Sequence, residues 1–456
     1  MVDGRAAGRR IKATPGATRL SALRRHLWPL VVMCVSSLVL VIGAVSTFTE
    51  LSPVDEGAHF DYIVRFPDVP VTGDTFTQET MELQACQGME LDYALPACDS
   101  APFEPVEFPG EGFSTAGTHP PLYYGLTALL ARPLAALTGV SLFVAARAIG
   151  ALWLALLMIL SYAIGITLGA SRKSSLGASL LLGSSSAIVT SASTLGPDIA
   201  AAAMGALLIL VTIRTDRSRP ASALVLIVAA LLGLTKLTTF LAVGVAVIWL
   251  VAVGTVLSDP PRDRVAIRKD IALALAVAAS FLLTSLGWLM WASSAAVLPA
   301  EEIPINQWFL TDSLDPRALV SHALLFFTPI SDGYVAPYLQ GISKIRLESI
   351  AAGIMVFGAA AAFAALRSDK RASGLGLGVL TAAVVGAPLL VLVNFYANGM
   401  FFQLSARYGY PLLGAYAACA AVAFRNKPQS GALVAIAGVV VAVVILQAEP
   451  FSIGSL

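Results

Sequence analysis

The chain has 456 residues, of which 57% are hydrophobic and only 12% are charged. Soluble domains usually carry about 25% charged residues, so this composition excludes an ordinary soluble protein. The net charge of +1 argues against a nucleic-acid partner. Apolar runs of about 20 residues recur, each long enough to cross the ~30 Å core of a bilayer. Because β-barrel alternation is absent, we expect an all-α polytopic membrane protein.

The first 27 residues carry seven Lys or Arg side chains against a single acidic residue, Asp3. By the positive-inside rule, this segment is expected to be a basic cytoplasmic tail. A cleaved signal peptide is the alternative. The apolar run from Trp28 to Phe48 is long for a signal peptide, and no small-residue cleavage site follows it. We therefore interpret it as the first span, with the N-terminus inside.

Residues 49–140 follow as the first predicted extracytoplasmic loop. Up to the Pro-Pro pair at 120–121 it holds 14 of the chain's 28 acidic residues and one base, Arg65. Dense carboxylates directly after a span favour an active-site loop, and we expect Asp55 and Glu56 to organise it. Residues 119–137 are amphipathic and begin with a helix-start signal. We expect a helix in the membrane interface there, not a span.

Ten further spans are predicted, at residues 141–168, 174–194, 198–213, 221–235, 238–257, 271–292, 346–366, 373–394, 408–424 and 432–446. Together with the first run they give about eleven transmembrane helices within residues 28–447. This alternation places most Lys and Arg clusters in the cytoplasm, as the positive-inside rule demands. It also predicts a second long extracytoplasmic loop at residues 293–345 and a short outer tail at residues 448–456.

The four cysteines fall into two classes. Cys34 and Cys419 lie in apolar runs and are expected to be inert. Cys86 and Cys98 lie in the acidic loop, where an oxidising compartment would favour a disulfide between them. Two free thiols are the alternative. No Cys/His spacing typical of zinc sites is present.

Several ionisable residues are predicted at the outer face, where the cost of placing them near a membrane marks them as functional candidates. Asp55 is a candidate base that accepts a proton from an acceptor hydroxyl. Glu56 would orient the acceptor or hold a divalent cation, Mg or Mn. Lys236 and Arg407 would stabilise the negative charge on a departing phosphate. The further candidates for substrate or donor-phosphate binding are His59, His119, Tyr123, Arg147 and Asp198.

Each candidate has a structural alternative. Asp55 and Glu56 follow a proline and would also suit the start of a helix. Asp198 would also suit a helix N-terminus, where the helix dipole favours a negative charge. Lys236 and Arg407 would also suit interfacial anchors whose charged ends reach toward water. His59 would also suit a hydrogen-bonded surface histidine. The argument for function depends on all of them sharing one side of the membrane.

At these residues the chain resembles the GT-C superfamily of polytopic glycosyltransferases, which includes protein O-mannosyltransferases and aminoarabinose transferases. Two segments frame the first loop: Asp55-Glu56 with Ala58-His59 and Tyr62, and His-Pro-Pro-Leu-Tyr-Tyr at residues 119–124. The other matching segments are Arg147, Gly-Pro-Asp at 196–198, Leu-Thr-Lys-Leu-Thr at 234–238, and Ala-Arg-Tyr at 406–408 with Pro411. The matches run from about residue 28 to residue 412.

The resemblance implies a GT-C-like helix bundle, an extracytoplasmic active site and a polyprenyl-phosphate sugar donor. It implies inversion at the anomeric carbon with Asp55 as the general base, and Lys236 and Arg407 near the donor phosphate. The acceptor would be a cell-envelope glycan, lipid or protein. A transporter or flippase of lipid-linked sugars is the main alternative function, and a non-catalytic membrane scaffold is another.

Overall fold

The computed structural model describes residues 15–53, 55–89, 93–255, 257, 263–330, 347–365 and 369–447, and side chains from residue 26 onward except 347, 348, 446 and 447. Three predicted segments lie wholly or partly outside these residues. They are the first 14 residues of the basic tail, residues 331–345 of the second long loop, and the tail 448–456.

The described residues form an all-α structure whose only β features are isolated bridges. Its helices are α1 (Pro15–Thr47), α2 (Glu56–Arg65), α3 (Gln78–Gln87), α4 (Leu122–Thr138), α5 (Leu142–Thr167), α6 (Arg172–Gly183), α7 (Ser186–Ser193), α8 (Asp198–Arg214), α9 (Arg219–Gly233), α10 (Phe240–Gly254), α11 (Arg264–Ala295), α12 (Pro304–Gln307), α13 (Pro316–His322), α15 (Leu347–Ala364), α16 (Lys370–Asn398), α17 (Leu413–Ala423) and α18 (Lys427–Gln447). The expected all-α architecture is therefore confirmed.

Six helical segments in the described residues are long and apolar enough to cross a membrane: residues 26–47, 142–167, 237–254, 264–295, 370–398 and 427–445. The pair α6 and α7, bent by 64° at its break, makes a seventh if it counts as one span. Each of the eleven predicted spans coincides with helix. However, α8 has 17 residues and α17 only 11, which is short for a full crossing. The protein is a multi-pass membrane protein, and the count of eleven remains a prediction.

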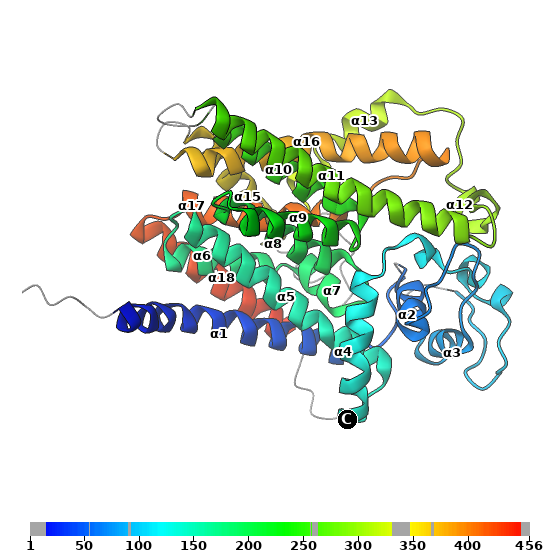
Figure 1. Ribbon diagram of the computed structural model, residues 1–456. Coiled ribbons are helices and arrows are strands. Elements are labelled where there is room, and N and C mark those ends of the chain that lie inside the picture. Colours follow the sequence, from blue (N-terminus) through cyan, green and yellow to red (C-terminus); the bar gives the residue numbers. More distant parts are fainter. Residues whose placement is uncertain are drawn as a thin grey trace, which may run out of the picture.

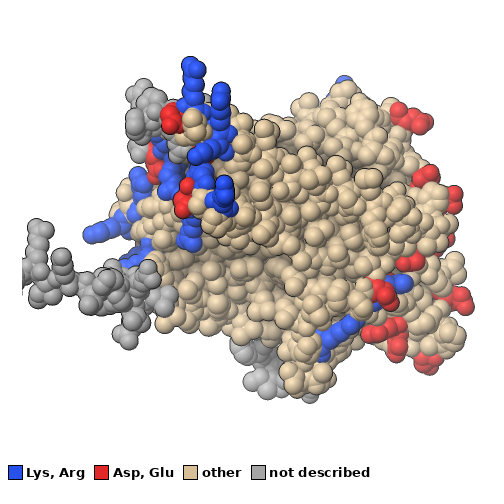
Figure 2. Space-filling model, viewed as in Figure 1, with Lys and Arg blue, Asp and Glu red and all other residues tan. Residues whose placement is uncertain are grey.

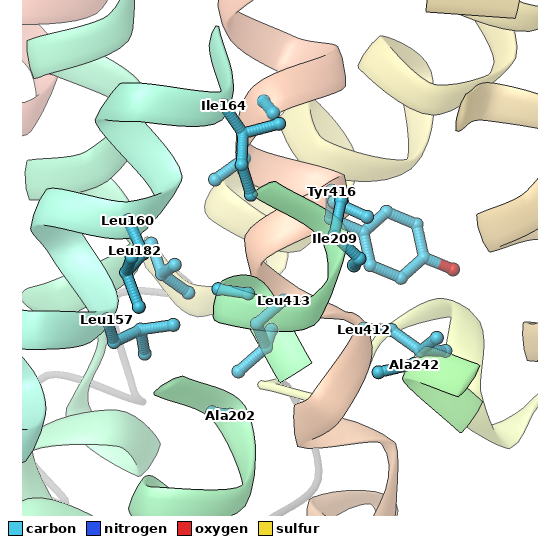
Figure 3. Close-up of a cluster of buried hydrophobic side chains, with 14 of the residues drawn as sticks. Leu157, Leu160, Ile164, Leu182, Ala202, Ile209, Ala242, Leu412, Leu413 and Tyr416 are labelled. Carbon is cyan, nitrogen blue, oxygen red and sulfur yellow. The ribbon is translucent and has the colours of Figure 1, made fainter. Parts of the chain in front are cut away.

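The core lies where α5, α6, α8, α10 and α17 meet (Figure 3). Leu157 and Ile164 from α5, Ile209 from α8, and Leu413 and Tyr416 from α17 are all buried there. Every residue of α17 up to Val422 is buried, and so is almost all of α8. A helix enclosed on all sides has no polar face, which explains why these two segments show continuous apolar sequence.

Charged side chains gather at opposite ends of the helix bundle (Figure 2). Lys and Arg cluster at the end where α8 finishes and α11, α16 and α18 begin. Asp and Glu cluster at the other end, over the segment between α1 and α4 and the segment after α11 (Figures 1 and 2). We refer to these as the basic end and the acidic end.

At the acidic end, α2, α3 and three short 3-10 turns (η1 Pro105–Glu107, η2 Pro109–Gly112 and η3 Thr115–Thr118) form a folded cap. Helix α4 runs crosswise to α1 and α5 at this end (Figure 1). This orientation agrees with a helix that does not span, and its place in the membrane interface remains a prediction. Arg132 of α4 donates to the carbonyl oxygens of Val64, at 3.1 Å, and Phe66, which lie at the C-terminal end of α2.

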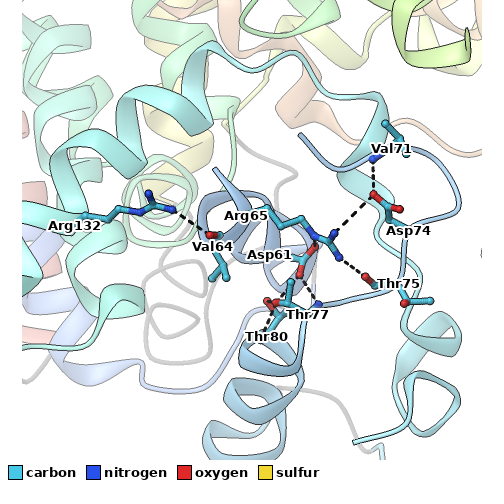
Figure 4. A network of polar contacts seen from close by, with 9 residues as sticks. All are labelled: Asp61, Val64, Arg65, Val71, Asp74, Thr75, Thr77, Thr80 and Arg132. Atoms are coloured by element: carbon cyan, nitrogen blue, oxygen red, sulfur yellow. Dashed lines mark hydrogen bonds and ion pairs between the residues drawn. The ribbon is translucent and has the colours of Figure 1, made fainter. Parts of the chain in front are cut away.

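Most acidic residues of the cap point outward, but Asp61 is fully buried and holds the cap together (Figure 4). Its carboxylate accepts from Arg65 Nε at 2.7 Å and from the Thr77 amide and hydroxyl at 2.8 and 2.9 Å. Arg65 also donates to the Thr75 carbonyl and lies 3.8 Å from Asp74. The only Lys or Arg of this loop before the Pro-Pro pair therefore serves the internal architecture of the cap.

The predicted disulfide is confirmed. Cys86, at the end of α3, is bonded to Cys98, and their Cα atoms lie 4.6 Å apart. Of the other two cysteines, Cys419 is buried in the core and Cys34 lies on the exposed surface of the spanning helix α1.

We expect a membrane-impermeant thiol reagent to label Cys86 and Cys98 only after reduction. Cys34 and Cys419 serve as internal controls, because one faces the lipid region and the other is buried. Mass spectrometry of peptides labelled before and after treatment with a reducing agent provides the measurement. Labelling of Cys86 without reduction would contradict the prediction.

Candidate active site

Asp55 occupies a special backbone position at the junction between the end of α1 and α2. It is the N-cap residue of α2 and adopts the left-handed conformation, with φ 59° and ψ 6°. Non-glycine residues adopt this conformation at a cost, although Asp and Asn tolerate it better than most. Its side chain makes no capping hydrogen bond. The helix-capping alternative therefore does not explain the carboxylate.

The Asp55 carboxylate is instead held from two sides. Thr115 Oγ1 donates to Asp55 Oδ1 at 3.2 Å, and Arg407 Nη2 lies 3.7 Å from Asp55 Oδ2. The side chain is 41% exposed. A carboxylate that is oriented but still open to solvent can accept a proton from a bound hydroxyl.

A cavity of about 340 Å³ opens beside Asp55 at the acidic end of the bundle. Of the candidates from sequence, the following line it: Asp55, His59, His119, Asp198, Lys236 and Arg407. The wall from α11 and α16 is mostly apolar, with Trp288, Leu289, Leu390 and Val393, and also carries three polar side chains, Ser285, Asn394 and Asn398. The structure thus brings together residues that are up to 352 positions apart in the sequence (Asp55 to Arg407).

The charged side chains of the cavity form an alternating chain. Lys236 Nζ donates to Asp198 Oδ1, and Asp198 Oδ2 lies 3.8 Å from Arg407 Nη1. Arg407 in turn reaches Asp55, so the order is Lys236, Asp198, Arg407, Asp55. Tyr408 lies against both cations, 5.0 Å from Lys236 Nζ and 5.7 Å from Arg407 Cζ to the ring centroid. Two positive and two negative groups therefore lie in alternation along the cavity.

Breaks in the helices place these groups. Lys236 lies between α9 and the turn η4 (Leu237–Thr239), and Arg407 lies in η8 (Ala406–Leu412) before α17. Asp198 is the first residue of α8, where the helix dipole favours a negative charge. The anchoring alternative does not fit Lys236, which is only 6% exposed and points inward to Asp198.

His59 and His119 form an uncharged wall of the same cavity. The side chain of His59 is buried and that of His119 is half-buried, and their ring centroids lie 5.4 Å apart. Burial lowers the pKa of each ring to about 3, with the positive charge of Lys236 adding to the effect. His59 Nδ1 shares a 2.8 Å hydrogen bond with the Tyr124 hydroxyl. Both histidines are therefore neutral near pH 7, and the surface alternative for His59 is wrong.

Glu56 and Arg147 are not brought to the cavity. They form a fully buried bidentate pair, with Arg147 Nε 2.8 Å from Glu56 Oε1 and Arg147 Nη2 2.6 Å from Glu56 Oε2. The Leu195 and Ser52 amides donate to the same carboxylate at 2.8 and 2.6 Å. Arg147 also donates to the Phe48 carbonyl at 2.6 Å. The pair thereby joins the end of α1, the start of α2, α5 and the turn before α8.

Tyr123 is also outside the cavity lining. It is buried in α4, and its hydroxyl accepts from the Gly196 amide at 3.1 Å. Gly196 precedes Asp198 by two residues, so Tyr123 fixes the turn that presents this carboxylate. Gly150 in α5 has a related role, because a Cβ there would lie 1.7 Å from the Ala192 carbonyl oxygen. Only glycine lets α7 approach α5 closely enough for the Leu195 amide to reach Glu56.

The described residues do not fit a divalent cation. No group of three His, Cys, Asp or Glu side chains in that part of the chain is arranged to hold a metal ion. Glu56 uses both carboxylate oxygens for Arg147 and two amides, and Asp198 is paired with Lys236 and Arg407. Among the described lining residues, Asp55 is the only carboxylate left for a metal ion, and a guanidinium lies beside it. The positive charges in the cavity are those of the Lys236 and Arg407 side chains.

Sequence reasoning missed several residues of the site. Thr115 orients Asp55 from η3, and Trp288 of α11 closes one wall while its Nε1 donates to the Thr118 carbonyl at 3.0 Å. Tyr408 was part of a motif but had no assigned role. A long-range contact such as that of Trp288 leaves no local pattern, whereas the position of Tyr408 next to Arg407 was a usable signal.

No protein-family model matches the chain, and no curated protein sequence matches it. Solved structures do match. ArnT from Cupriavidus metallidurans bound to undecaprenyl phosphate is 17% identical, with a TM-score of 0.50, covering 94% of this chain and 64% of that chain. The archaeal oligosaccharyltransferase AglB from Archaeoglobus fulgidus, in complex with an inhibitory peptide and a dolichol-phosphate, is 15% identical, with a TM-score of 0.52 and coverages of 93% and 55%.

The Archaeoglobus fulgidus oligosaccharyltransferase complex with Zn and sulfate also matches, at 14% identity and a TM-score of 0.50, covering 92% of this chain and 53% of that chain. This chain thus spans between about half and two thirds of the length of these structures. At such identities the likeness shows the fold alone. The helical fold is shared with ArnT and AglB, in agreement with the fold that the sequence resemblance implied.

The buried pair generates a prediction about stability. Glu56→Gln should destabilise the protein by roughly 3–5 kcal/mol, because it leaves Arg147 buried without a compensating charge. Thermal unfolding of the detergent-solubilised protein, followed by circular dichroism, measures this. Glu104→Gln is a matched control, since Glu104 is exposed on the cap. An unfolding midpoint for Glu56→Gln equal to that of Glu104→Gln would rule out the structural role.

Proposed function

We propose that this protein is an inverting glycosyltransferase that moves a sugar from a polyprenyl-phosphate donor to an acceptor hydroxyl at the outer face of the cytoplasmic membrane. The observation that carries the proposal is the shared cavity of Asp55, Lys236 and Arg407. The fold likeness supports it, because ArnT was solved with undecaprenyl phosphate and AglB with a dolichol-phosphate.

The donor phosphate would lie between Lys236 and Arg407. Arginine binds phosphate through a planar fork, and lysine acts as a point charge. The polyprenyl chain would lie along the mostly apolar wall between α11 and α16, where Leu289 is 38% and Val393 46% exposed. The cavity therefore offers an anion site and an apolar exit side by side, as a lipid-linked donor needs.

In the reaction, the acceptor oxygen would attack the anomeric carbon from the face opposite the phosphate. Asp55 would take the proton of that hydroxyl as the new C–O bond forms. The bond between the anomeric carbon and the phosphate oxygen would break, with its electron pair leaving on the phosphate. Lys236 and Arg407 would stabilise that charge. His59 and His119 would line the site without adding a charge of their own.

We infer the membrane orientation from the distribution of charge. The basic end would face the cytoplasm by the positive-inside rule, and the acidic end with the cavity would face outward. This places the N-terminus inside and the C-terminus outside. An outward cavity favours a lipid-linked donor, because nucleotide sugars are cytosolic compounds.

The acceptor would be a cell-envelope glycan, lipid or protein. A transporter or flippase of lipid-linked sugars is the alternative, but such proteins place ionisable residues near the middle of broken helices. Here the charged groups of the cavity gather at one end of the bundle, among helix ends and the cap. That placement favours chemistry at one face over passage across the membrane.

Asp55→Asn should reduce sugar transfer by about 10²–10⁴-fold, the usual contribution of a general base. Asparagine tolerates the left-handed conformation, so the backbone at position 55 should be retained. The measurement is transfer from a polyprenyl-phosphate sugar by the purified protein, alongside thermal unfolding. Asp68→Asn, which alters an exposed carboxylate of the same loop, is the control. Near-normal turnover of Asp55→Asn would exclude the base role.

Arg407→Gln should lower kcat/KM for the lipid donor by about 10²-fold, because one of the two groups that stabilise the departing phosphate is lost. Arg425→Gln is the matched control, since Arg425 is 46% exposed and pairs with Asp369 away from the cavity. Initial rates over a range of donor concentrations separate the two variants. Donor kinetics that are unchanged in Arg407→Gln would remove this assignment.

A further inference from the structure

A second pocket lies on the other side of Asp55. It has a volume of about 100 Å³ and is formed by the start of α2, by α3 and the turns η2 and η3, and by α12 of the second outer loop. Asp55 is the only residue that lines both this pocket and the main cavity among the described residues. A carboxylate between two pockets is positioned to take a proton from a group in one of them while the other holds the donor.

One polar side chain that lines this pocket has an amide nitrogen without a hydrogen-bond partner. Gln84 of α3 lines the pocket and is 1% exposed, yet its amide nitrogen makes no hydrogen bond. A buried donor left unpaired lowers the stability of the fold. The neighbouring Gly57 makes room for it, since a Cβ there would lie 2.8 Å from Gln84 Nε2. A ligand that accepts this hydrogen bond would remove the cost.

The rest of the lining defines the chemistry of that ligand. Phe76, Phe113, Met89 and Ile305 give it apolar and aromatic walls. No Lys, Arg or His is present among the described residues that line it, and the Glu56 carboxylate is already paired with Arg147. The surrounding cap is strongly acidic. An anionic group therefore has no binding partner here. A cationic group would find no unpaired carboxylate in the lining, because Asp55 lies beside Arg407 and Glu56 is paired with Arg147, so a neutral group is favoured.

Recognition of a peptide backbone is disfavoured as well. The bridges Leu51–Met89 and Thr75–Phe113 already pair backbone groups on two sides of the pocket. An added strand would need free backbone groups at an edge. A sugar ring needs aromatic surface for its C–H face and a few polar groups for its hydroxyls, which is what these side chains supply.

We infer that this pocket is the acceptor subsite and that it binds an uncharged sugar unit, with Gln84 as a specificity-determining residue. The inference rests on the proposed glycosyl transfer, in which Asp55 deprotonates the acceptor. The acceptor hydroxyl would lie at Asp55, and Gln84 would donate to a second oxygen of the same ring. The subsite is built largely from the cap, together with Ile305 from the second outer loop.

The test is ligand binding without donor, by saturation-transfer NMR on the full-length protein in detergent. The probes are the methyl glycosides of glucose, galactose, mannose and arabinose, and a neutral hexapeptide containing Ser and Thr. At least one methyl glycoside should bind the wild type. Gln84→Leu should weaken that binding about tenfold or more, because the hydrogen bond that Gln84 donates to the sugar is lost. Gln87→Leu, at an exposed position of the same helix, should not.

A purely structural Gln84 would give a different result. Replacing an unpaired buried amide by leucine should leave the unfolding midpoint equal or higher, so folding does not obscure the test. Binding of no glycoside, equal binding by Gln84→Leu and wild type, or binding of the peptide alone would each overturn the inference. Slow donor hydrolysis, with water in place of the acceptor, should be unchanged in Gln84→Leu. If the wild-type protein showed no donor hydrolysis, this result would count against the proposed function and not against the subsite.

Discussion

The buried pair of Glu56 and Arg147 is the interaction on which the rest of the site depends. Two charges removed from water are stable only when every hydrogen-bonding position is used, and here the carboxylate accepts four hydrogen bonds. The partners come from the end of α1, α2, α5 and the turn before α8. Because Glu56 directly follows Asp55, fixing it also fixes the residue that enters the cavity. Asp198 directly follows the turn before α8, which Glu56 also holds. The positions of both cavity carboxylates, Asp55 and Asp198, therefore depend on the pair of Glu56 and Arg147.

The cations of the cavity are arranged so that they can exchange one anionic partner for another. Lys236 and Arg407 face Asp198 and Asp55 in the structure, and the distances around Arg407, 3.7 and 3.8 Å, exceed those of hydrogen bonds. An arriving phosphate would compete with the two carboxylates for the same cations. That competition would loosen Arg407 from Asp55 and leave the carboxylate free of its neighbour when the donor is bound. Donor binding and the release of this carboxylate would thus be linked through one guanidinium.

Much of this arrangement was accessible from the sequence, and the reason lies in the cost of polar groups in membranes. Lys236 and Arg407 interrupt apolar runs, and such residues need a specific partner, so grouping them with Asp55 and Asp198 on one side was a sound prediction. Glu56 and Arg147 met the same criterion and were placed in the site, although they satisfy each other behind it. Charge and position along a span identify the residues that need partners, but they do not say which partner each one finds.

The left-handed backbone at Asp55 limits what this position can become. Among carboxylic acids, glutamate would keep the charge, but it lacks the short side chain that makes φ near 59° tolerable for aspartate. Glycine and asparagine would keep the backbone and lose the proton acceptor. Substitution at position 55 is therefore restricted by two requirements: a carboxylate and a residue that tolerates the left-handed backbone. Descendants of this protein that retained binding but lost the proposed proton transfer would be expected to carry glycine or asparagine there and not glutamate.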